Sequence, residues 1–191
     1  MLKKFSHWIR RVSNGWVALS TLVIFLLFTA LVLPAQASRT QAYTETAGSP
    51  DMSFYYTADD LYQMAEAYGE NGREAYVSAR FTFDLIWPMV YMIFLCTGIS
   101  WVYGKAFAPG SAWQLANLVP ILGMLLDYLE NIATSIVMMR YPIPTPVVDS
   151  LAAVLTMGKW VCVGGSFALL IAGVGVGVWR LVRERAMHKA A

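Results

Sequence analysis

The chain has 191 residues, of which 58% are hydrophobic and only 14% are charged, and its mean hydropathy is +0.52. A soluble domain carries charge on roughly a quarter of its residues, and the apolar residues here fall in long runs, so the composition predicts an integral membrane protein. The net charge of +2 gives no reason to expect nucleic-acid binding.

Four apolar segments are long enough to cross a bilayer, which takes about 20 residues. The predicted spans are 16–35, 79–103, 113–139 and 148–178. The expected fold is therefore all-α: a four-helix transmembrane bundle. Basic segments 1–15 and 179–191 flank it, and the loop 36–78 between the first two spans is expected to contain short helices.

The first span has a second interpretation as a signal peptide. Lys3, Lys4, Arg10 and Arg11 precede it, and the AQA tripeptide at 35–37 resembles a cleavage site. The apolar stretch is longer than the usual core of a signal peptide, which favours an uncleaved first helix.

The basic residues predict the orientation of the spans. The N-terminal segment, Lys105 and the sequence RLVRERAMHK fall on one side if the chain crosses four times. By the positive-inside rule, both termini of this multi-pass protein are expected on the cytoplasmic side of the plasma membrane. The loop 36–78 is then exoplasmic, and its excess of acidic residues suits that side. These acids are Glu45, Asp51, Asp59, Asp60, Glu66, Glu70 and Glu74.

The exoplasmic loop contains helix signals of its own. Thr57 and Asp60 have the spacing of a capping box, and Gly69 stands where that helix is expected to end. Asn71 is expected to begin a second helix that runs directly into the second span. The polar, turn-rich stretch 38–53 is expected to be the most flexible piece.

An apolar stripe on the first loop helix is expected to pack on the outer rim of the bundle or to lie at the membrane interface. It comprises Leu61, Ala65 and Tyr68. Several tyrosines are expected at the membrane interface, where aromatic rings sit well. They are Tyr55, Tyr56, Tyr62, Tyr76 and Tyr141.

Charged and polar residues interrupt three of the spans. Asp127, Glu130 and Asn131 are spaced i, i+3 and i+4, so they share one helical face. Asp84 lies on the second span and Lys159 on the fourth. At 1.5 Å per residue, all five lie about 8 to 18 Å below the outer end of their spans. This common layer is the strongest indication of a functional site.

Charges at this depth need partners, because an unpaired charge at the centre of a membrane helix costs about 2.5 to 3.5 kcal/mol. Lys159 can neutralise one carboxylate, and Arg80 can neutralise another from the rim. The negative charge that remains predicts that a proton, a cation or water enters the layer.

Further residues are expected to support this site. Pro88 frees the backbone carbonyl of Asp84, and Pro120 is expected to kink the third span. Asn117 is compatible with the polar stripe of the third span. The supporting side chains are Arg80, Trp87, Tyr91 and Tyr128.

Other chemistries lack support in the sequence. Cys96 and Cys162 form no CxxC pair, and no P-loop or dinucleotide fingerprint is present, so no cofactor is expected. The histidines, His7 and His188, lie outside the expected bundle.

Small residues on the fourth span predict close helix packing. They are Gly164, Ala168, Ala172, Gly173 and Gly177.

Three short motifs carry a resemblance to other proteins. GENGREAY, DLIWPMVY and DYLEN, which begin at Gly69, Asp84 and Asp127, follow the patterns GxxGRxxY, DxxxPxxY and DxxEN. Together they resemble a group of uncharacterised prokaryotic four-span membrane proteins. The resemblance covers roughly residues 56–160. It implies a four-helix membrane bundle and supplies no activity.

Three functions fit the sequence. The first is a binding or transport protein in which Asp84, Asp127 and Glu130 bind or relay a cation, a proton or a cationic amphipathic ligand, while Asn131 orients it and Lys159 balances charge. The alternative is a structural or accessory subunit whose charges join helices and whose outer loop docks a protein partner. The third is an intramembrane lipid-modifying enzyme using an acid pair, or a divalent metal held by it. Membrane lipid is the expected partner throughout.

Overall fold

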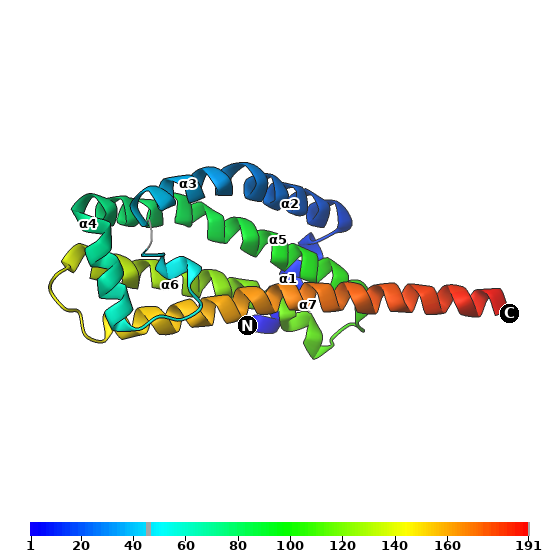
Figure 1. The fold of residues 1–191 in the computed structure, drawn as a ribbon. Coiled ribbons are helices and arrows are strands. Elements are labelled where there is room, and N and C mark those ends of the chain that lie inside the picture. Colours follow the sequence, from blue (N-terminus) through cyan, green and yellow to red (C-terminus); the bar gives the residue numbers. More distant parts are fainter. Residues whose placement is uncertain (45–46, 191) are drawn as a thin grey trace.

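The computed structural model describes residues 1–44 and 47–190, which form helices and connecting turns without a strand (Figure 1). Four helical stretches are long and apolar enough to cross a membrane: Gly15–Thr44, Ala58–Ala106, Ala112–Arg140 and Val148–Met187. The expected all-helical chain with four candidate spans is confirmed. The elements in chain order are α1 (Leu2–Val12), α2 (Gly15–Leu27), the π-helical turn η1 (Phe28–Val32), α3 (Leu33–Thr44), the 3-10 turn η2 (Pro50–Met52), α4 (Ala58–Arg80), α5 (Phe83–Ala106), the 3-10 segment η3 (Ala112–Leu118), α6 (Val119–Arg140) and α7 (Val148–Ala190).

Helix α4 folds over one end of the bundle formed by α5, α6 and α7 (Figure 1). Its apolar stripe packs there, with Leu61 and Ala65 completely buried. The same hydrophobic cluster includes Val137 and Met138 of α6 and Ala152 of α7. The packing expected for this stripe is therefore observed, and it fixes the segment that precedes α5 against the bundle.

The first candidate span lies at the periphery and is attached mainly to α5. Figure 1 shows α2 and α3 running alongside α5. The ring of Phe25 stacks on Phe94 at a centroid distance of 4.7 Å, and the hydroxyls of Thr21 and Thr97 are 2.7 Å apart. Ala18 is the one buried residue of α2. Most of this helix is thus left outside the packed core of the bundle.

Helix α4 begins at the predicted capping box and leads to α5 after a two-residue break. The Thr57 hydroxyl accepts a hydrogen bond from the Asp60 amide at 3.2 Å, and the Asp60 carboxylate accepts one from the Thr57 amide at 2.8 Å. Gly69 interrupts the helix with φ of 62°, a conformation that glycine adopts readily. The expected direct run into span two is interrupted only at Phe81 and Thr82, which separate the last residue of α4, Arg80, from the start of α5 at Phe83.

The stretch 38–53, which is expected to be the most flexible piece, is largely helical in the residues that the structure describes. Residues 38–44 are the last turns of α3, and 50–52 form η2. The alanine, glutamine and arginine of 36–41 favour helix, and the Tyr43 ring packs edge-on against Tyr68 at 5.7 Å. Residues 45 and 46 of the stretch lie outside the described residues.

Two of the tyrosines expected at the membrane interface are core residues instead. Tyr76 is completely buried, and Tyr56 is 3% exposed with its hydroxyl 3.0 Å from that of Thr156. Both are covered because α4 and the segment before it lie against α6 and α7. Tyr55, by contrast, is well exposed.

The start of the third span differs from expectation at Pro120 and Asn117. Pro120 lies in the first turn of α6, where a missing amide hydrogen breaks no helical bond, so the predicted kink is not needed. Asn117 precedes α6 and donates hydrogen bonds to the Ser6 carbonyl at 3.1 Å and the Ser100 hydroxyl at 2.8 Å. It therefore belongs to the α1 end of the bundle and not to the polar stripe.

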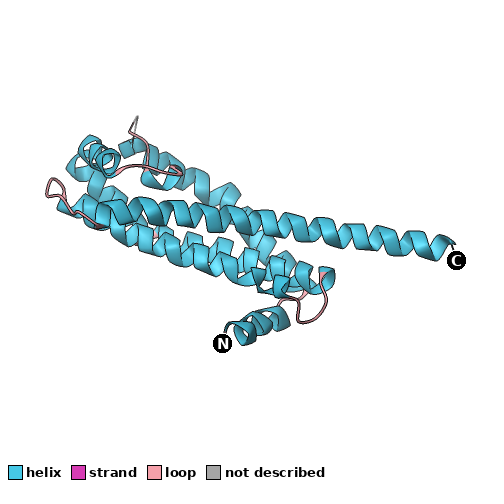
Figure 2. Cartoon of the chain, turned by 90° about the horizontal axis from the view of Figure 1, so that it is seen from below, coloured by secondary structure: helices cyan, strands magenta, loops and turns pink. Residues whose placement is uncertain are grey.

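The two terminal segments are more helical than the sequence suggested. Segment 2–12 forms α1, beside the turn between α5 and η3 (Figure 2). Helix α7 has 43 residues, which corresponds to about 65 Å at 1.5 Å per residue. It exceeds the roughly 30 Å of a hydrocarbon core and projects beyond the bundle (Figure 2).

The small residues of α7 divide into two groups. A methyl group on Gly173 would lie 2.4 Å from Cε2 of Tyr103, so this glycine permits close packing of α7 on α5. Nothing lies within 4 Å of the corresponding position on Gly164, and Ala168 and Ala172 are exposed. The predicted packing role therefore holds for Gly173 and is wrong for the Gly164 ridge within this chain.

Replacing Gly173 by alanine is expected to destabilise the protein, because the Tyr103 ring must move. Overpacking of this kind costs about 1 to 3 kcal/mol. Gly164→Ala is the matched control, and because alanine favours helix over glycine by up to about 1 kcal/mol, it is expected to keep or slightly raise stability. Thermal unfolding of both variants in detergent measures the difference, and equal melting temperatures would contradict the described packing.

Candidate functional site

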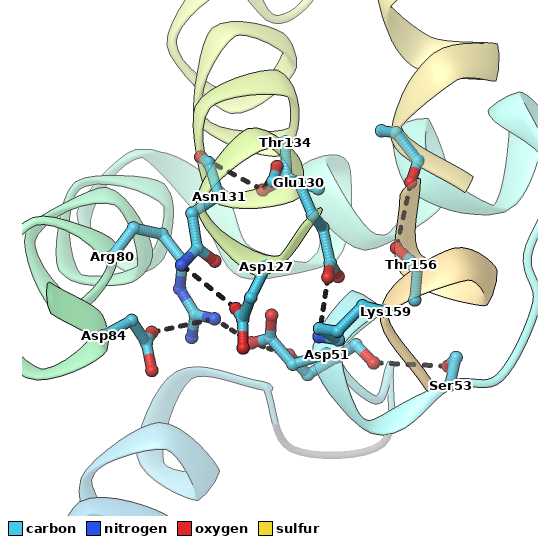
Figure 3. Close-up of polar contacts among 12 residues, drawn as sticks. Asp51, Ser53, Arg80, Asp84, Asp127, Glu130, Asn131, Thr134, Thr156 and Lys159 are labelled. Atoms are coloured by element: carbon cyan, nitrogen blue, oxygen red, sulfur yellow. Dashed lines mark hydrogen bonds and ion pairs between the residues drawn. The ribbon is translucent and has the colours of Figure 1, made fainter. Parts of the chain in front are cut away.

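Six charged side chains from five segments meet near the α4 end of the bundle (Figure 3). We call them the charged layer: Asp51, Arg80, Asp84, Asp127, Glu130 and Lys159. All but Asp51 are buried in the described chain, which leaves Asp51 partly exposed. The structure thus brings the four charged residues predicted as the site into one region, with Asn131 beside them and Arg80 among them.

Glu130 and Lys159 form the most deeply buried ion pair of the layer. The Lys159 ammonium lies 2.6 Å from the Glu130 carboxylate, and the two side chains are 7% and 0% exposed. The ammonium also lies 5.4 Å from the centre of the Trp160 ring. This pair joins α6 to α7, and each charge neutralises the other in a region that excludes water.

Arg80 joins the end of α4 to two carboxylates. Its guanidinium pairs with Asp51 and lies 2.9 Å from the carboxylate of Asp84, one turn along the chain. The guanidinium also stacks over the Tyr76 ring at 4.5 Å. Arg80 was expected at the rim, but it is buried, because the α4 segment folds inward and the 47–53 segment covers it.

Asp51 is the member of the layer that sequence reasoning missed. It lies in η2, within a stretch expected to be flexible, and one acid in an acidic loop carries no distinguishing signal. The turn is closed by hydrogen bonds from the Met52 amide to Ser49 and from the Ser53 amide to Pro50, each 3.1 Å long. The turn thereby places the Asp51 carboxylate over the buried Arg80.

Asp127 is held by neutral donors. The Tyr91 hydroxyl donates to its Oδ2 at 2.9 Å, and the Asn131 amide donates to its Oδ1 at 3.4 Å. In the described chain, no lysine or arginine lies within ion-pair distance of Asp127. The supporting role expected of Tyr91 and the orienting role expected of Asn131 therefore apply to this carboxylate.

The other two supporting residues have different surroundings. Trp87 stacks on Phe28 at 5.5 Å and meets Tyr91 edge-on at 5.8 Å, so it stands between the first span and the layer. Tyr128 donates to the Leu85 carbonyl at 2.8 Å on an exposed face of α6. Tyr128 thus links α6 to α5 and does not line the site.

A cavity of about 390 Å³ opens onto the charged layer between α3, α5 and α7. Asp51, Arg80, Asp84, Asp127 and Lys159 contribute to its wall, whereas Glu130 does not. Apolar and aromatic side chains form much of the remaining wall: Leu33, Ala37, Met52, Phe83, Trp87 and Trp160. The cavity wall therefore combines charged side chains with apolar and aromatic ones, and polar side chains of α3 also contribute to it.

The layer also contains acceptor atoms without a protein donor. In the described part of the chain, Asp51 Oδ1, Asn131 Oδ1 and Glu130 Oε1 are buried and have no hydrogen-bond partner. Buried acceptors are normally satisfied by protein, water or a ligand. Of these residues only Asp51 lines the cavity, so its Oδ1 is the acceptor that a donor entering the cavity can reach.

The arrangement does not resemble a metal site. Across the residues that the structure describes, no three side chains of His, Cys, Asp or Glu lie together in a way that could hold a metal ion. Cys96 and Cys162 are both free, and the Cys96 thiol donates to the Asn117 carbonyl at 3.2 Å. The carboxylates are instead divided among Arg80, Lys159 and the neutral donors around Asp127.

Comparison with known proteins gives no relative for this arrangement: no family model, curated protein or solved structure matches the chain. Its chemistry is accordingly inferred from the charges, contacts and cavity of the charged layer.

Replacing Lys159 by methionine is expected to lower the free energy of unfolding by about 3 to 5 kcal/mol. The change leaves Glu130 buried without a partner, and breaking a buried ion pair has this magnitude. Adding Glu130→Gln is expected to restore much of the loss. Lys105→Met removes an exposed lysine and serves as the control in thermal unfolding. An unchanged melting temperature for Lys159→Met would contradict the pairing.

Replacing Asp51 by asparagine is expected to loosen η2, because its charged contact with Arg80 is lost. Hydrogen bonds between charged groups contribute about 1.5 to 3 kcal/mol, which corresponds to tenfold or faster local opening. Amide hydrogen exchange at Met52 and Ser53 measures this opening. Asp59→Asn makes the same chemical change at an exposed position, and an equal response to both changes would contradict the role of Asp51.

Proposed function

We propose that the chain is a multi-pass membrane protein whose charged layer binds a cation, and that a cationic amphipathic ligand fits it best. The observation that carries the proposal is the position of Asp127. This buried carboxylate lines the cavity, and neutral groups alone satisfy it. A positively charged ligand group would supply the ionic partner that it lacks.

The charges of the layer favour a cation. Asp51, Asp84, Asp127 and Glu130 face two basic residues, Arg80 and Lys159. With all six groups ionised, the layer has two more negative than positive charges. In a region of low dielectric constant, such an excess draws in a proton or a cation.

The cavity wall favours an organic cation over a small inorganic one. Trp87 and Trp160 stand at the wall, and aromatic faces attract ammonium groups while their apolar surface accepts a hydrocarbon tail. A bare metal ion would need several ligands close together. Among the described residues, no three side chains of His, Cys, Asp or Glu are placed to hold one. A ligand with an ammonium head and an apolar tail matches both the charged and the apolar side chains of the cavity wall.

The position between α3 and α7 suggests an approach from the lipid. Segments of the first span line one side of the cavity, and this span is weakly packed on the bundle. We place the α4 end on the exoplasmic side of the plasma membrane, and both termini in the cytoplasm, because the basic segments gather at the other end. The ligand would then enter from the outer leaflet.

A structural or accessory role is the alternative, and one observation favours it. Arg80 connects the 47–53 segment to α5 through Asp51 and Asp84, and Lys159 connects α7 to α6. Such bonds hold helices together. In that case, replacing Asp127 would change stability without changing the response to any ligand.

Binding of decyltrimethylammonium tests the proposal, with decanol as its neutral counterpart. Purified protein in uncharged detergent is titrated calorimetrically. We expect Asp127→Asn to weaken binding of the ammonium compound at least tenfold, since a hydrogen-bonded or ionic contact to a charged group contributes about 1.5 to 3 kcal/mol.

Asp59→Asn is the matched control, because it removes one carboxylate from an exposed position on α4. It is expected to bind like the unmodified protein. Equal binding of decanol and the ammonium compound, or unchanged binding by Asp127→Asn, would refute the proposed site.

A further inference from the structure

Helix α1, at the end of the bundle opposite the charged layer, has three distinct faces. Ser6, Ile9 and Ser13 are buried against the bundle. A second face is basic and comprises Lys3, Lys4, His7, Arg10 and Arg11. A third face exposes Phe5 and Trp8, whose side chains are 46% and 58% exposed and whose rings stack at 6.1 Å. A helix of this kind lies in the plane of a membrane surface.

The buried face fixes the orientation of α1. The Ser6 hydroxyl donates to the Gln114 carbonyl at 3.1 Å, and the Asn117 amide donates to the Ser6 carbonyl at the same distance. Gln114 in turn accepts from the Gly110 amide and donates to the Ala108 carbonyl. These bonds hold α1 against the connection between α5 and α6. They prevent rotation of α1 about its axis, so the basic face and the aromatic face keep their directions.

The basic face of α1 borders a cleft of about 650 Å³, which we call the α1 cleft. Lys3, Lys4, His7 and Arg10 line one side, and Gly104, Gly110 and Gln114 line the other. The Arg10 guanidinium donates to Nδ1 of His7 at 3.2 Å. No described carboxylate pairs with Lys3, Lys4 or Arg10. Positive charge is thus concentrated along one side of the cleft.

The distribution of acids along the chain reinforces this charge. Residues 1–44 and 85–126, which supply α1 and the connection from α5 to α6, contain no aspartate or glutamate. The basic groups of the α1 cleft therefore lack internal counterions. An anion from outside the protein can fill that role.

We propose that the α1 cleft binds the phosphate-bearing headgroup of an anionic phospholipid. The basic face meets the phosphate, while Phe5 and Trp8 enter the acyl region beside it. A soluble phosphate compound would use the basic face alone and leave these two exposed rings in water. The combination of both faces therefore favours a lipid, and this inference does not depend on the function of the charged layer.

Native mass spectrometry of the full chain tests the proposal with defined lipids. The protein is mixed in uncharged detergent with phosphatidylglycerol, phosphatidylcholine or free glycerol 3-phosphate. We expect phosphatidylglycerol to be retained, and the other two to bind at least tenfold more weakly. Melting temperatures recorded for each variant confirm that the protein remains folded.

The variant that removes the site is Lys3→Gln/Lys4→Gln/Arg10→Gln. Each surface lysine or arginine contributes about fivefold to binding of anionic lipid, so the triple change is expected to weaken phosphatidylglycerol binding roughly a hundredfold. Arg180→Gln/Arg183→Gln/Arg185→Gln removes the same charge from the exposed part of α7 and is expected to retain binding.

Three results would overturn the proposal. Equal loss in both triple variants would show attraction to general positive charge. Unchanged binding by the α1 variant would place the lipid elsewhere. Binding of glycerol 3-phosphate as strong as that of the lipid would show a site for a soluble phosphate compound.

Discussion

The pairing of buried charges is the constraint on which the arrangement of this bundle depends. Glu130 is completely buried in the middle of α6, and Lys159 of α7 lies 2.6 Å from it. Neither charge is tolerable alone in an apolar interior, so the pair fixes how the two helices face each other. Arg80 at the end of α4 pairs with Asp84 of α5 and links these two helices in the same way. Asp127 is the exception, because it is buried and held by neutral donors alone, and the proposed cation site is placed beside it for that reason.

The two ends of the bundle have opposite electrostatic character. Acids outnumber bases in the charged layer near α4, whereas the segments that form the α1 end contain bases and no acids. We propose that this asymmetry serves two purposes in a membrane. Basic groups at one surface set the orientation and attract anionic lipid. In the orientation that we propose, the acidic layer and its cavity lie toward the opposite leaflet, where they would bind a cationic ligand.

The sequence was sufficient for the four spans and for the central residues of the layer. Asp127, Glu130 and Asn131 share a helical face by spacing alone, and depth counting aligned them with Asp84 and Lys159. Charge partners that meet only because the chain folds back on itself could not be predicted from spacing. Asp51 reaches Arg80 because η2 and α4 fold back over the bundle, and no local pattern encodes that contact. Gly173 and Gly164 likewise look equivalent in sequence, and only the neighbouring Tyr103 distinguishes them.

Photolabelling with a photoreactive alkyltrimethylammonium compound tests the central claim most directly, because it reports where a cation with an apolar tail binds. Labelled protein is digested and the modified peptides are identified, with and without excess decyltrimethylammonium. If the cavity binds the cation, competable labels are expected on the α3, α5 and α7 segments around it, including the peptides that contain Trp87 and Trp160. Labels spread over the lipid-facing surface of the bundle, and unaffected by the competitor, would contradict it.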